Sequence, residues 1–304
     1  MRLSSIPLRL SLFLLLCAAM LVAGQEARAV QTIVDDSGQT VTLQAPPRRI
    51  IPLYAAMSEL LKELGLADRI VGRTASDETL PGTLPVVGTH MRPNFEIVTG
   101  LRPDLLIQLE GREEAALAAQ RFMELGIPVA RFRIASFDDL FSCILRLGTL
   151  CGAKEQADAV VAGYKQELEA VQAGIRASDG TPKIFFEVRY PNLLGAGGGN
   201  MLSDIARKAG AVNLLEEYPQ RLVRLSEEAL VAFEPDIYIV LEGPMNKHAQ
   251  HPAERPHFAG LKAVRDNRVY VLREEDFSRP GPGSLKAVRE LVRIRNEWLE
   301  NNGS

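Results

Sequence analysis

The sequence predicts an α/β protein of two lobes, each with a mainly parallel sheet, joined by one long helix. Three observations support this fold class. Short apolar strands alternate with amphipathic helices, a pattern that favours parallel strands covered by helices on both faces. The segment 154–177 interrupts this alternation, because its apolar residues recur at helical spacing throughout. The mature chain, which would begin at about Val30, is also too long for one compact core and suits two lobes.

Residues 1–29 have the composition of an export signal. Two arginines precede an apolar run from Ser11 to Gly24, and Ala27-Arg28-Ala29 supplies the small residues of a cleavage site. The apolar run is shorter than the roughly 20 residues that span a bilayer, so we expect cleavage and export to the periplasm. The alternatives are a retained anchor and lipidation of Cys17, which the bulky Leu16 before it disfavours.

The first predicted lobe covers residues 30–153. It opens with an alternating hairpin around a Ser-Gly turn, which Pro46 and Pro47 separate from the sheet. Strands are expected at short apolar runs between turn residues, and helices where apolar residues recur at helical spacing. The expected strands are 49–53, 69–72, 85–88, 104–109 and 128–132. The expected helices are 58–64, 95–100, 113–125 and 136–151.

The second predicted lobe covers residues 178–304 and repeats the alternation. Its run Gly195–Asn200 fits neither a dinucleotide fingerprint nor a P-loop, so we interpret it as a flexible cleft loop rather than a phosphate site. Crevices of open α/β sheets lie beyond the carboxyl ends of the strands, so we expect a ligand cleft between the lobes. The expected strands are 183–188, 236–241 and 268–272, and the expected helices are 200–209, 226–233 and 284–300.

Composition disfavours several functional classes. The 35 basic and 38 acidic side chains are nearly balanced, which gives no electrostatic footprint for nucleic acid. Cys143 and Cys151 would lie roughly 12 Å apart along one helix, beyond disulfide reach, so we expect two packed thiols. The sequence contains no Gly-x-Ser-x-Gly elbow and no His-Glu-x-x-His pair, and we therefore do not expect an enzyme.

An ordered series of motifs along the mature chain resembles the periplasmic binding proteins for iron-siderophores, haem and cobalamin. The motifs are Asp35 to Gly38, Pro47 to Ile51, Glu59 to Gly72, Asn94 to Val98, Leu101 to Leu106, Leu125 to Val129, Leu202 to Asn213, Phe233 to Tyr238 and Arg279 to Pro282. The resemblance implies two Rossmann-like lobes, a rigid connecting helix and a cleft that holds one metal chelate. It also implies an ABC permease in the inner membrane as partner, no resident cofactor, and a monomer.

Two departures from the family pattern leave the chelate open among siderophore, haem and cobalamin. Gly283 stands where many members carry an arginine, and the loop 243–258 is unusually rich in His and Pro.

Candidate ligand residues follow predicted strands, where the cleft should lie. An aromatic ring or imidazole could stack on a macrocycle, and an imidazole or thioether could coordinate a metal. Guanidinium groups pair bidentately with carboxylates. The alternatives are packed aromatic and methionine side chains and solvated surface charges, and we expect at least one of the arginines to be such a charge. The candidate set is Tyr54, His90, Met91, Arg92, Arg112, Arg189, Tyr190 and Arg279.

Glu96 and Glu228 each stand at the start of a predicted helix, one in each lobe. The resemblance implies that such glutamates dock onto arginines of the permease. Stabilisation of the helix dipole is the alternative reading, and both roles are compatible.

His248, His251 and His257 share the loop 243–258. Together with His90 they could serve a receptor for a bare zinc or manganese ion, which is the alternative function. Their spacing matches no helical zinc motif, so a solvated surface loop is the expected structure.

Overall fold

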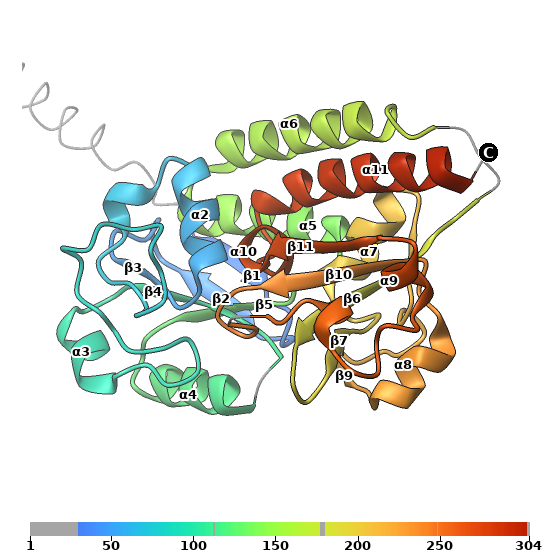
Figure 1. Cartoon of the computed structure of the whole chain (residues 1–304). Coiled ribbons are helices and arrows are strands. Elements are labelled where there is room, and N and C mark those ends of the chain that lie inside the picture. The colour runs from blue at the N-terminus through green and yellow to red at the C-terminus, as the bar shows by residue number, and fades with distance from the viewer. Residues whose placement is uncertain (1–29, 112, 177–179, 248, 303–304) are drawn as a thin grey trace, which may run out of the picture.

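The computed structural model describes residues 30–111, 113–176, 180–247 and 249–302 (Figure 1). The predicted leader, residues 1–29, lies outside this described part, as do Arg112 and His248. Two main sheets lie next to each other beneath the long helices α6 (Lys154–Gln172) and α11 (Gly283–Asn302), which run side by side (Figure 1). Within the described ranges, no helix is long and apolar enough to cross a membrane.

The first lobe contains a parallel sheet, as predicted, and its strands lie in the order β3-β4-β5. An antiparallel hairpin, β1–β2, precedes this sheet. The carboxylate of Asp35 closes the hairpin turn by accepting hydrogen bonds from the backbone N–H groups of Ser37 and Gln39, at 2.9 and 3.0 Å. The elements of this lobe are β1 (Gln31–Val34), β2 (Thr40–Leu43), β3 (Ile50–Pro52), α2 (Ala55–Glu63), η1 (Ala67–Arg69), α3 (Phe95–Gly100), β4 (Leu105–Leu109), α4 (Glu113–Glu124), β5 (Val129–Phe132) and α5 (Phe137–Cys151).

Helix α6 connects the lobes and is about 28 Å long at 1.5 Å per residue. It ends at Gln172, before the predicted limit of 177. Its buried residues, Ala157, Val161, Tyr164 and Leu168, recur at helical spacing and belong to a core cluster that includes residues of both lobes. The helical side of the interface is therefore a shared apolar core.

The second lobe contains a mixed sheet in the order β11-β10-β6-β7-β9, with β8 paired to β6. β6, β8, β10 and β11 run parallel, whereas β7 pairs antiparallel with β6 and β9. The sequence missed β7 and β9, so this sheet is less parallel than expected. The elements are β6 (Lys183–Arg189), β7 (Leu194–Ala196), α7 (Met201–Lys208), β8 (Val212–Asn213), β9 (Leu222–Arg224), α8 (Glu227–Phe233), β10 (Ile237–Glu242), η2 (Pro252–Glu254), α9 (Lys262–Arg265), β11 (Val269–Arg273), α10 (Glu274–Ser278) and α11.

Two predicted strands of the first lobe, 69–72 and 85–88, are wrong. Isolated bridges join Ile50 to Ile70 and Arg73 to Val86, but no extended pairing forms in these segments. Ile70 and Val87 are buried and Val86 is 40% exposed. Each segment therefore packs against the lobe through single apolar residues and forms no continuous ladder.

The glycines at 197–199 are closely packed, so the expectation of a flexible cleft loop is wrong. A Cβ atom on Gly197 would lie 2.2 Å from the carbonyl oxygen of Gln220, and one on Gly198 would lie 2.1 Å from that of Glu216. Glycine is required here because two backbone segments approach each other.

Cys143 and Cys151 are free and buried within α5, as predicted. Burial raises the pKa of the Cys151 thiol to about 12 and raises that of Cys143 as well. Both side chains are therefore uncharged packing groups at neutral pH.

Candidate functional site

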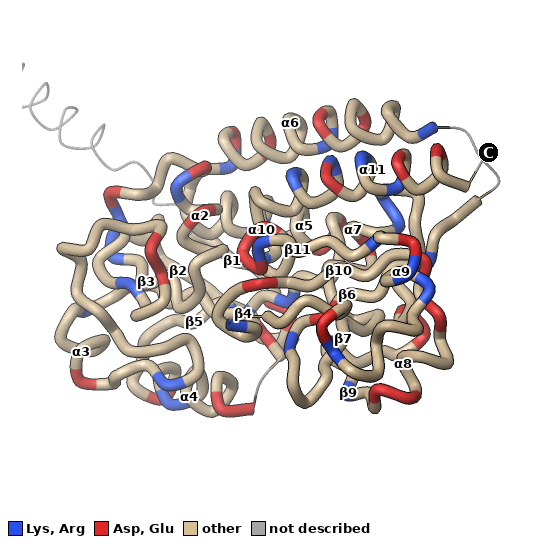
Figure 2. The backbone as a smooth tube through the Cα atoms, viewed as in Figure 1, with Lys and Arg blue, Asp and Glu red and all other residues tan. Residues whose placement is uncertain are grey.

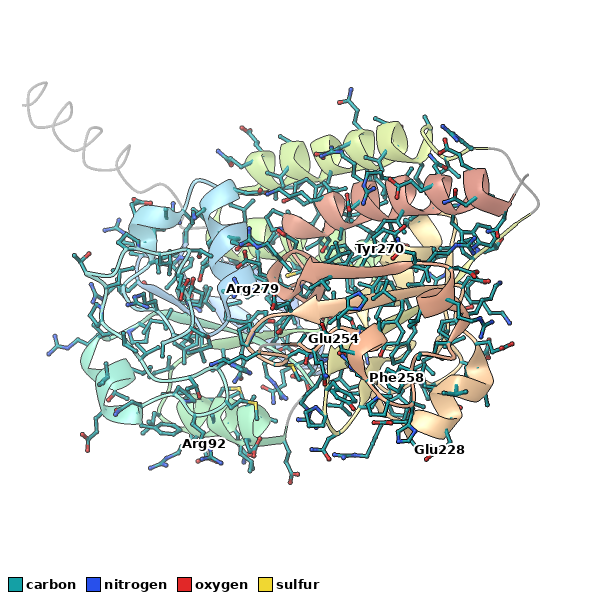
Figure 3. The ribbon with its side chains drawn as sticks, in the orientation of Figure 1. Arg92, Glu228, Glu254, Phe258, Tyr270 and Arg279 are labelled. Carbon is teal, nitrogen blue, oxygen red and sulfur yellow. The ribbon has the colours of Figure 1, made fainter. Side chains whose placement is uncertain are left out.

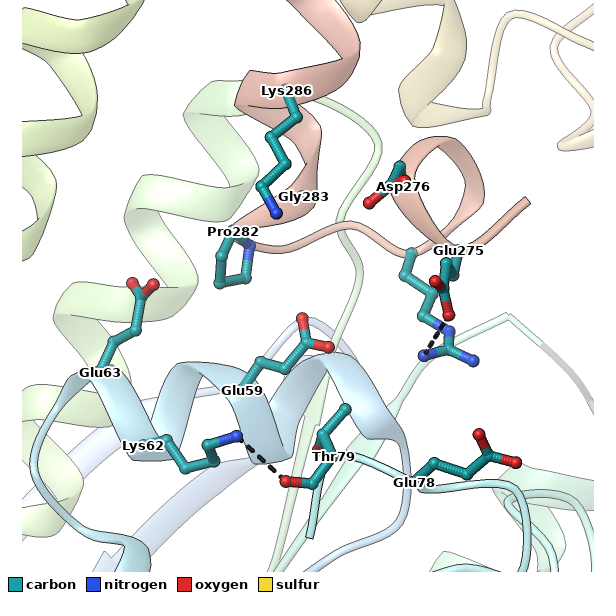
Figure 4. Close-up of a pocket in the computed structure, with 11 residues that line it drawn as sticks. Glu59, Lys62, Glu63, Glu78, Thr79, Glu275, Asp276, Pro282, Gly283 and Lys286 are labelled. Carbon is teal, nitrogen blue, oxygen red and sulfur yellow. Dashed lines mark hydrogen bonds and ion pairs between the residues drawn. The ribbon is translucent and has the colours of Figure 1, made fainter. Parts of the chain in front are cut away.

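A cavity of about 600 Å³ opens between the lobes, with α2 on one side and α10 and the start of α11 on the other (Figure 4). Of the predicted ligand residues that the structure describes, only Arg279 lines it. The cavity is lined by Glu59, Lys62, Glu63, Glu78, Thr79, Glu275, Asp276, Arg279, Pro282, Gly283 and Lys286.

Acidic side chains outnumber basic ones around this cavity. The acids are Glu59, Glu63, Glu78, Glu275 and Asp276, and the bases are Lys62, Arg279 and Lys286. The Arg279 guanidinium already has a partner within the chain, because its Nη1 atom lies 3.9 Å from Glu275 Oε2. Burial raises the pKa of the Glu59 carboxyl and outweighs the attraction of Arg279 and Lys62, which lower it. A further carboxylate entering the cavity would meet like charge.

Tyr54 and His90 lie together at the edge of the first lobe. Their ring centroids are 5.7 Å apart in an edge-to-face arrangement. Tyr54 occupies the N-cap position of α2 directly beyond β3, and its ring also packs against the core cluster. Tyr54 therefore follows a strand, as predicted, whereas His90 follows a segment that forms only an isolated bridge, and the two rings meet all the same.

A tight turn holds His90 and Met91 in place. Gly88 has a φ of 96°, and a Cβ atom there would lie 2.6 Å from the carbonyl oxygen of Arg92. The backbone N–H of Thr89 donates to that same carbonyl at 3.2 Å. Met91 is half-buried and Arg92 is exposed, well apart from Arg279 (Figure 3). The structure therefore does not gather the predicted arginines at one point.

Arg189 and Tyr190 end the first strand of the second lobe, as predicted, and both are half-buried. Arg189 Nε has no hydrogen-bond partner among the described residues. The Tyr190 hydroxyl donates to Glu227 Oε1 at 3.1 Å, and its backbone N–H donates to Asn246 Oδ1 at 3.1 Å. Burial and the bond to Glu227 raise the pKa of Tyr190.

Glu96 and Glu228 occupy equivalent positions in α3 and α8. Each is exposed in the first turn of its helix. Each helix is capped by the preceding side chain: Asn94 Oδ1 accepts from Ile97 N–H at 3.0 Å, and Ser226 Oγ accepts from Ala229 N–H at 3.2 Å. Acidic residues mark these helices at opposite ends of the molecule (Figure 2). Both carboxylates are therefore placed to stabilise a helix start.

The described histidines of the loop 243–258 form no metal site. His251 Nδ1 accepts a hydrogen bond from Ala253 N–H at 3.2 Å and thereby caps η2, whereas His257 is exposed. Within the described residues, no group of three or more His, Cys, Asp or Glu side chains is arranged to hold a metal ion. The expectation of a solvated loop is only partly correct, because Arg255 and Phe258 are buried.

Sequence reasoning missed the acidic lining of the cavity. Glu59 follows Tyr54 by little more than one helical turn, and Glu275 precedes Arg279 by about one turn. The short sequence distance from predicted ligand residues was therefore the signal that could have identified these two acids. Which of the many surface glutamates meet between the lobes depends on how the lobes pack.

Comparisons with known proteins agree with this architecture. An uncharacterized ABC transporter substrate-binding lipoprotein from Bacillus subtilis is 28% identical over 299 residues, covering 91% of this chain and 94% of the relative. A vitamin B12-binding protein from Vibrio cholerae is 24% identical over 250 residues, covering 81% and 88%.

Solved structures share the fold. The crystal structure of a periplasmic vitamin B12 binding protein of Vibrio cholerae matches with a TM-score of 0.72 at 23% identity, covering 84% of this chain and 99% of that one. A periplasmic haem-binding protein from Pseudomonas aeruginosa matches with a TM-score of 0.69 at 25% identity, covering 81% and 91%. The sequence profile of the periplasmic binding proteins matches residues 50–275. Because this match spans more than half of the chain, the protein belongs to the periplasmic binding protein family.

Proposed function

We propose that this protein is exported to the periplasm, captures a metal chelate between its lobes and delivers it to the permease of an ABC importer. The chelate is a ferric siderophore, haem or cobalamin, and it leaves the protein chemically unchanged. The observation that carries the proposal is the charged cavity between the lobes of a chain of this family. The lobes, 30–153 and 178–304, act as one monomer.

The ligand contacts come from both lobes. Tyr54, His90 and Met91 supply aromatic and soft groups from the first lobe, and Arg189, Tyr190 and Arg279 supply polar and aromatic groups from the second. Arg279 lines the cavity, and the other residues contact the parts of the chelate that extend beyond it. Arg92 and Arg112 supply guanidinium donors to polar groups of the chelate.

Among the three chelates, a corrinoid is the first choice. The cavity has more acids than bases, and Arg279 lies close to Glu275. Propionates of haem or the carboxylates of a siderophore would therefore meet repulsion, whereas the neutral amides of a corrinoid would accept and donate hydrogen bonds. The vitamin B12-binding relatives support the same choice.

A visible-absorbance titration tests this proposal. Purified protein is mixed separately with cyanocobalamin, haemin and a ferric hydroxamate, and unbound compound is removed by gel filtration. One chelate should remain at a one-to-one ratio, and cyanocobalamin is expected. Elemental analysis supplies the contrary result: stoichiometric zinc or manganese without an organic chelate would support the bare-metal receptor instead.

Glu96 and Glu228 dock the loaded protein onto arginines of the permease. Glu96→Ala with Glu228→Ala should leave cyanocobalamin affinity intact but weaken uptake into vesicles that carry the permease, with less dependence on salt. Normal uptake by the double variant would remove the docking role. Loss of ligand binding would instead move these residues to the cleft.

A further inference from the structure

The loop 243–258 is fixed to the second lobe by a buried arginine. Arg255 is 1% exposed although it stands in a polar segment, and Phe258 is fully buried beside it. The guanidinium Nε and Nη2 atoms donate to the carbonyl oxygen of Gln250 at 3.1 and 2.5 Å. In Figure 3, Glu254 and Phe258 are labelled on the second lobe. The buried Arg255 side chain therefore fixes the backbone of this loop by hydrogen bonds.

Arg255 forms a fully buried ion pair with Glu187 of β6. Its Nη1 and Nη2 atoms donate to the two carboxylate oxygens at 2.5 and 2.9 Å, and both side chains have 0% exposure. The Tyr238 hydroxyl and Asn246 Nδ2 also donate to this carboxylate, at 2.5 and 2.9 Å. The pair thus joins β6, β10 and the loop at one point.

The energetic contribution of this pair does not explain its presence. Removing two charges from water costs several kcal/mol for each ion, and apolar replacements of buried pairs are often neutral or stabilising. Buried ionic groups have a better-supported use in fixing one arrangement of the chain. The relevant question is which neighbouring group this network holds in one arrangement.

That neighbour is Tyr190. The Arg255 guanidinium carbon lies 3.8 Å from the centroid of the Tyr190 ring, and the Phe258 ring meets it edge-on at 5.9 Å. Asn246, which bonds to Glu187, also accepts the backbone N–H of Tyr190. The ring face and the backbone of Tyr190 are therefore both held by residues of one network.

We propose that Arg255 is a positioning residue that fixes the Tyr190 ring for ligand binding. The role of Tyr190 in ligand binding rests on the proposed function. The packing of Arg255 on the Tyr190 ring does not depend on it. The guanidinium covers one face of the ring, so the half-buried ring has one orientation to offer a ligand. Pre-ordering an aromatic side chain avoids the entropy loss of ordering it on binding.

Fluorine NMR tests this inference independently of any ligand. The protein is labelled with 3-fluorotyrosine, and the Tyr190 resonance is assigned with Tyr190→Phe. The key variant is Glu187→Gln with Arg255→Met, which removes both charges. The glutamine oxygen keeps an acceptor for Asn246, and its NH2 group can donate to the Tyr238 hydroxyl. The control is Asp236→Asn with Lys262→Met, which removes an ion pair of the same lobe.

In the key variant the Tyr190 resonance should move toward that of Tyr218, which is 39% exposed, while it stays in place in the control. Affinity for cyanocobalamin should fall up to about tenfold, as in Tyr190→Ala. An unmoved Tyr190 resonance in the folded key variant would overturn the inference. If that variant does not fold, the Tyr190 resonance is measured in Arg255→Lys instead. Lysine keeps the positive charge but lacks the planar guanidinium that packs on the ring.

The cyanocobalamin affinities distinguish a failure of this inference from a failure of the proposed function. A Tyr190 resonance that moves as expected, in a protein whose wild type binds no cyanocobalamin, supports the positioning role and counts against the corrinoid. Wild-type affinity retained by a key variant whose Tyr190 resonance has moved would overturn the role in binding.

Discussion

The two lobes meet through an apolar core, here called the apolar side, and through a charged cavity next to it, here called the charged side. On the helical side, α5, α6, α7 and α11 contribute to one buried core cluster. At the cavity, α2 faces α10 and the start of α11 across acids and bases, and the lobes approach closely where a Cβ atom on Gly281 would lie 3.6 Å from Ala56 Cβ. The apolar side should hold the lobes in a fixed relation, while the charged side contributes little to stability and is free to select a ligand.

The largest effect is expected from a cavity in the apolar side. Leu291→Ala, at a fully buried position of α11, should lower the free energy of unfolding by about 2–5 kcal/mol and the Tm by about 10 °C. Thermal unfolding followed by circular dichroism should still show a single transition, because the core is shared. Leu117→Ala is the control, since Leu117 is 60% exposed. Two separate transitions, with only one shifted, would contradict a shared core.

A smaller loss is expected at the polar contact between α7 and α5. Asp204 is buried, and its Oδ2 atom accepts the backbone N–H of Phe137 at 2.8 Å. Asp204→Ala should destabilise the protein by about 1–3 kcal/mol, because this buried donor loses its partner. Asp158→Ala, which removes an exposed pair with Lys154, should cost less than about 0.5 kcal/mol in urea unfolding. If Asp204→Ala loses as little free energy of unfolding as Asp158→Ala, the contact between the lobes contributes little to stability.

At the rim of the cleft, affinity should change more than stability. His90→Ala should weaken cyanocobalamin binding about tenfold and change the Tm by less than about 2 °C, because rim residues contribute little core burial. His257→Ala should leave affinity unchanged, since that exposed residue lies in another loop. Isothermal titration beside thermal unfolding separates the two effects. A large loss of stability with intact affinity would make His90 a packing residue.

The smallest effect is expected from Glu59. Its raised pKa means that the folded state disfavours the carboxylate, so its favourable contribution exists below the unfolded pKa and is lost as pH rises through the folded value. Glu59→Gln should therefore raise the Tm by about 1 °C at pH 7 and have no such effect near pH 3. The exposed Glu217→Gln is the control. If Glu59→Gln stabilised the protein at pH 3 and not at pH 7, the pKa of Glu59 would be lowered rather than raised by folding.

Local patterns predicted much of the fold. Helix α3 occupies the predicted range 95–100, and the Asn94 side chain caps its start. By contrast, β7 and β9 are three residues each and pair only within the folded sheet, so no local periodicity marks them.

The site was less predictable because its members meet through tertiary packing. Tyr54 could be placed beyond a strand end, but the strand expected before His90 does not form. The acidic lining depends on which face of α2 meets α10. Arg255 had the sequence context of a solvated loop residue. It is buried only because Glu187, distant in sequence, provides its carboxylate.

Small-angle scattering on gel-filtered protein, with visible absorbance recorded on the same sample, tests the central claim most directly. The claim is that a chelate binds between lobes whose relation is fixed by the apolar side. We expect cyanocobalamin to co-migrate at a one-to-one ratio while the radius of gyration, about 19 Å for a compact chain of this size, stays unchanged. A clear contraction on binding, or protein that elutes without the chelate, would contradict the account.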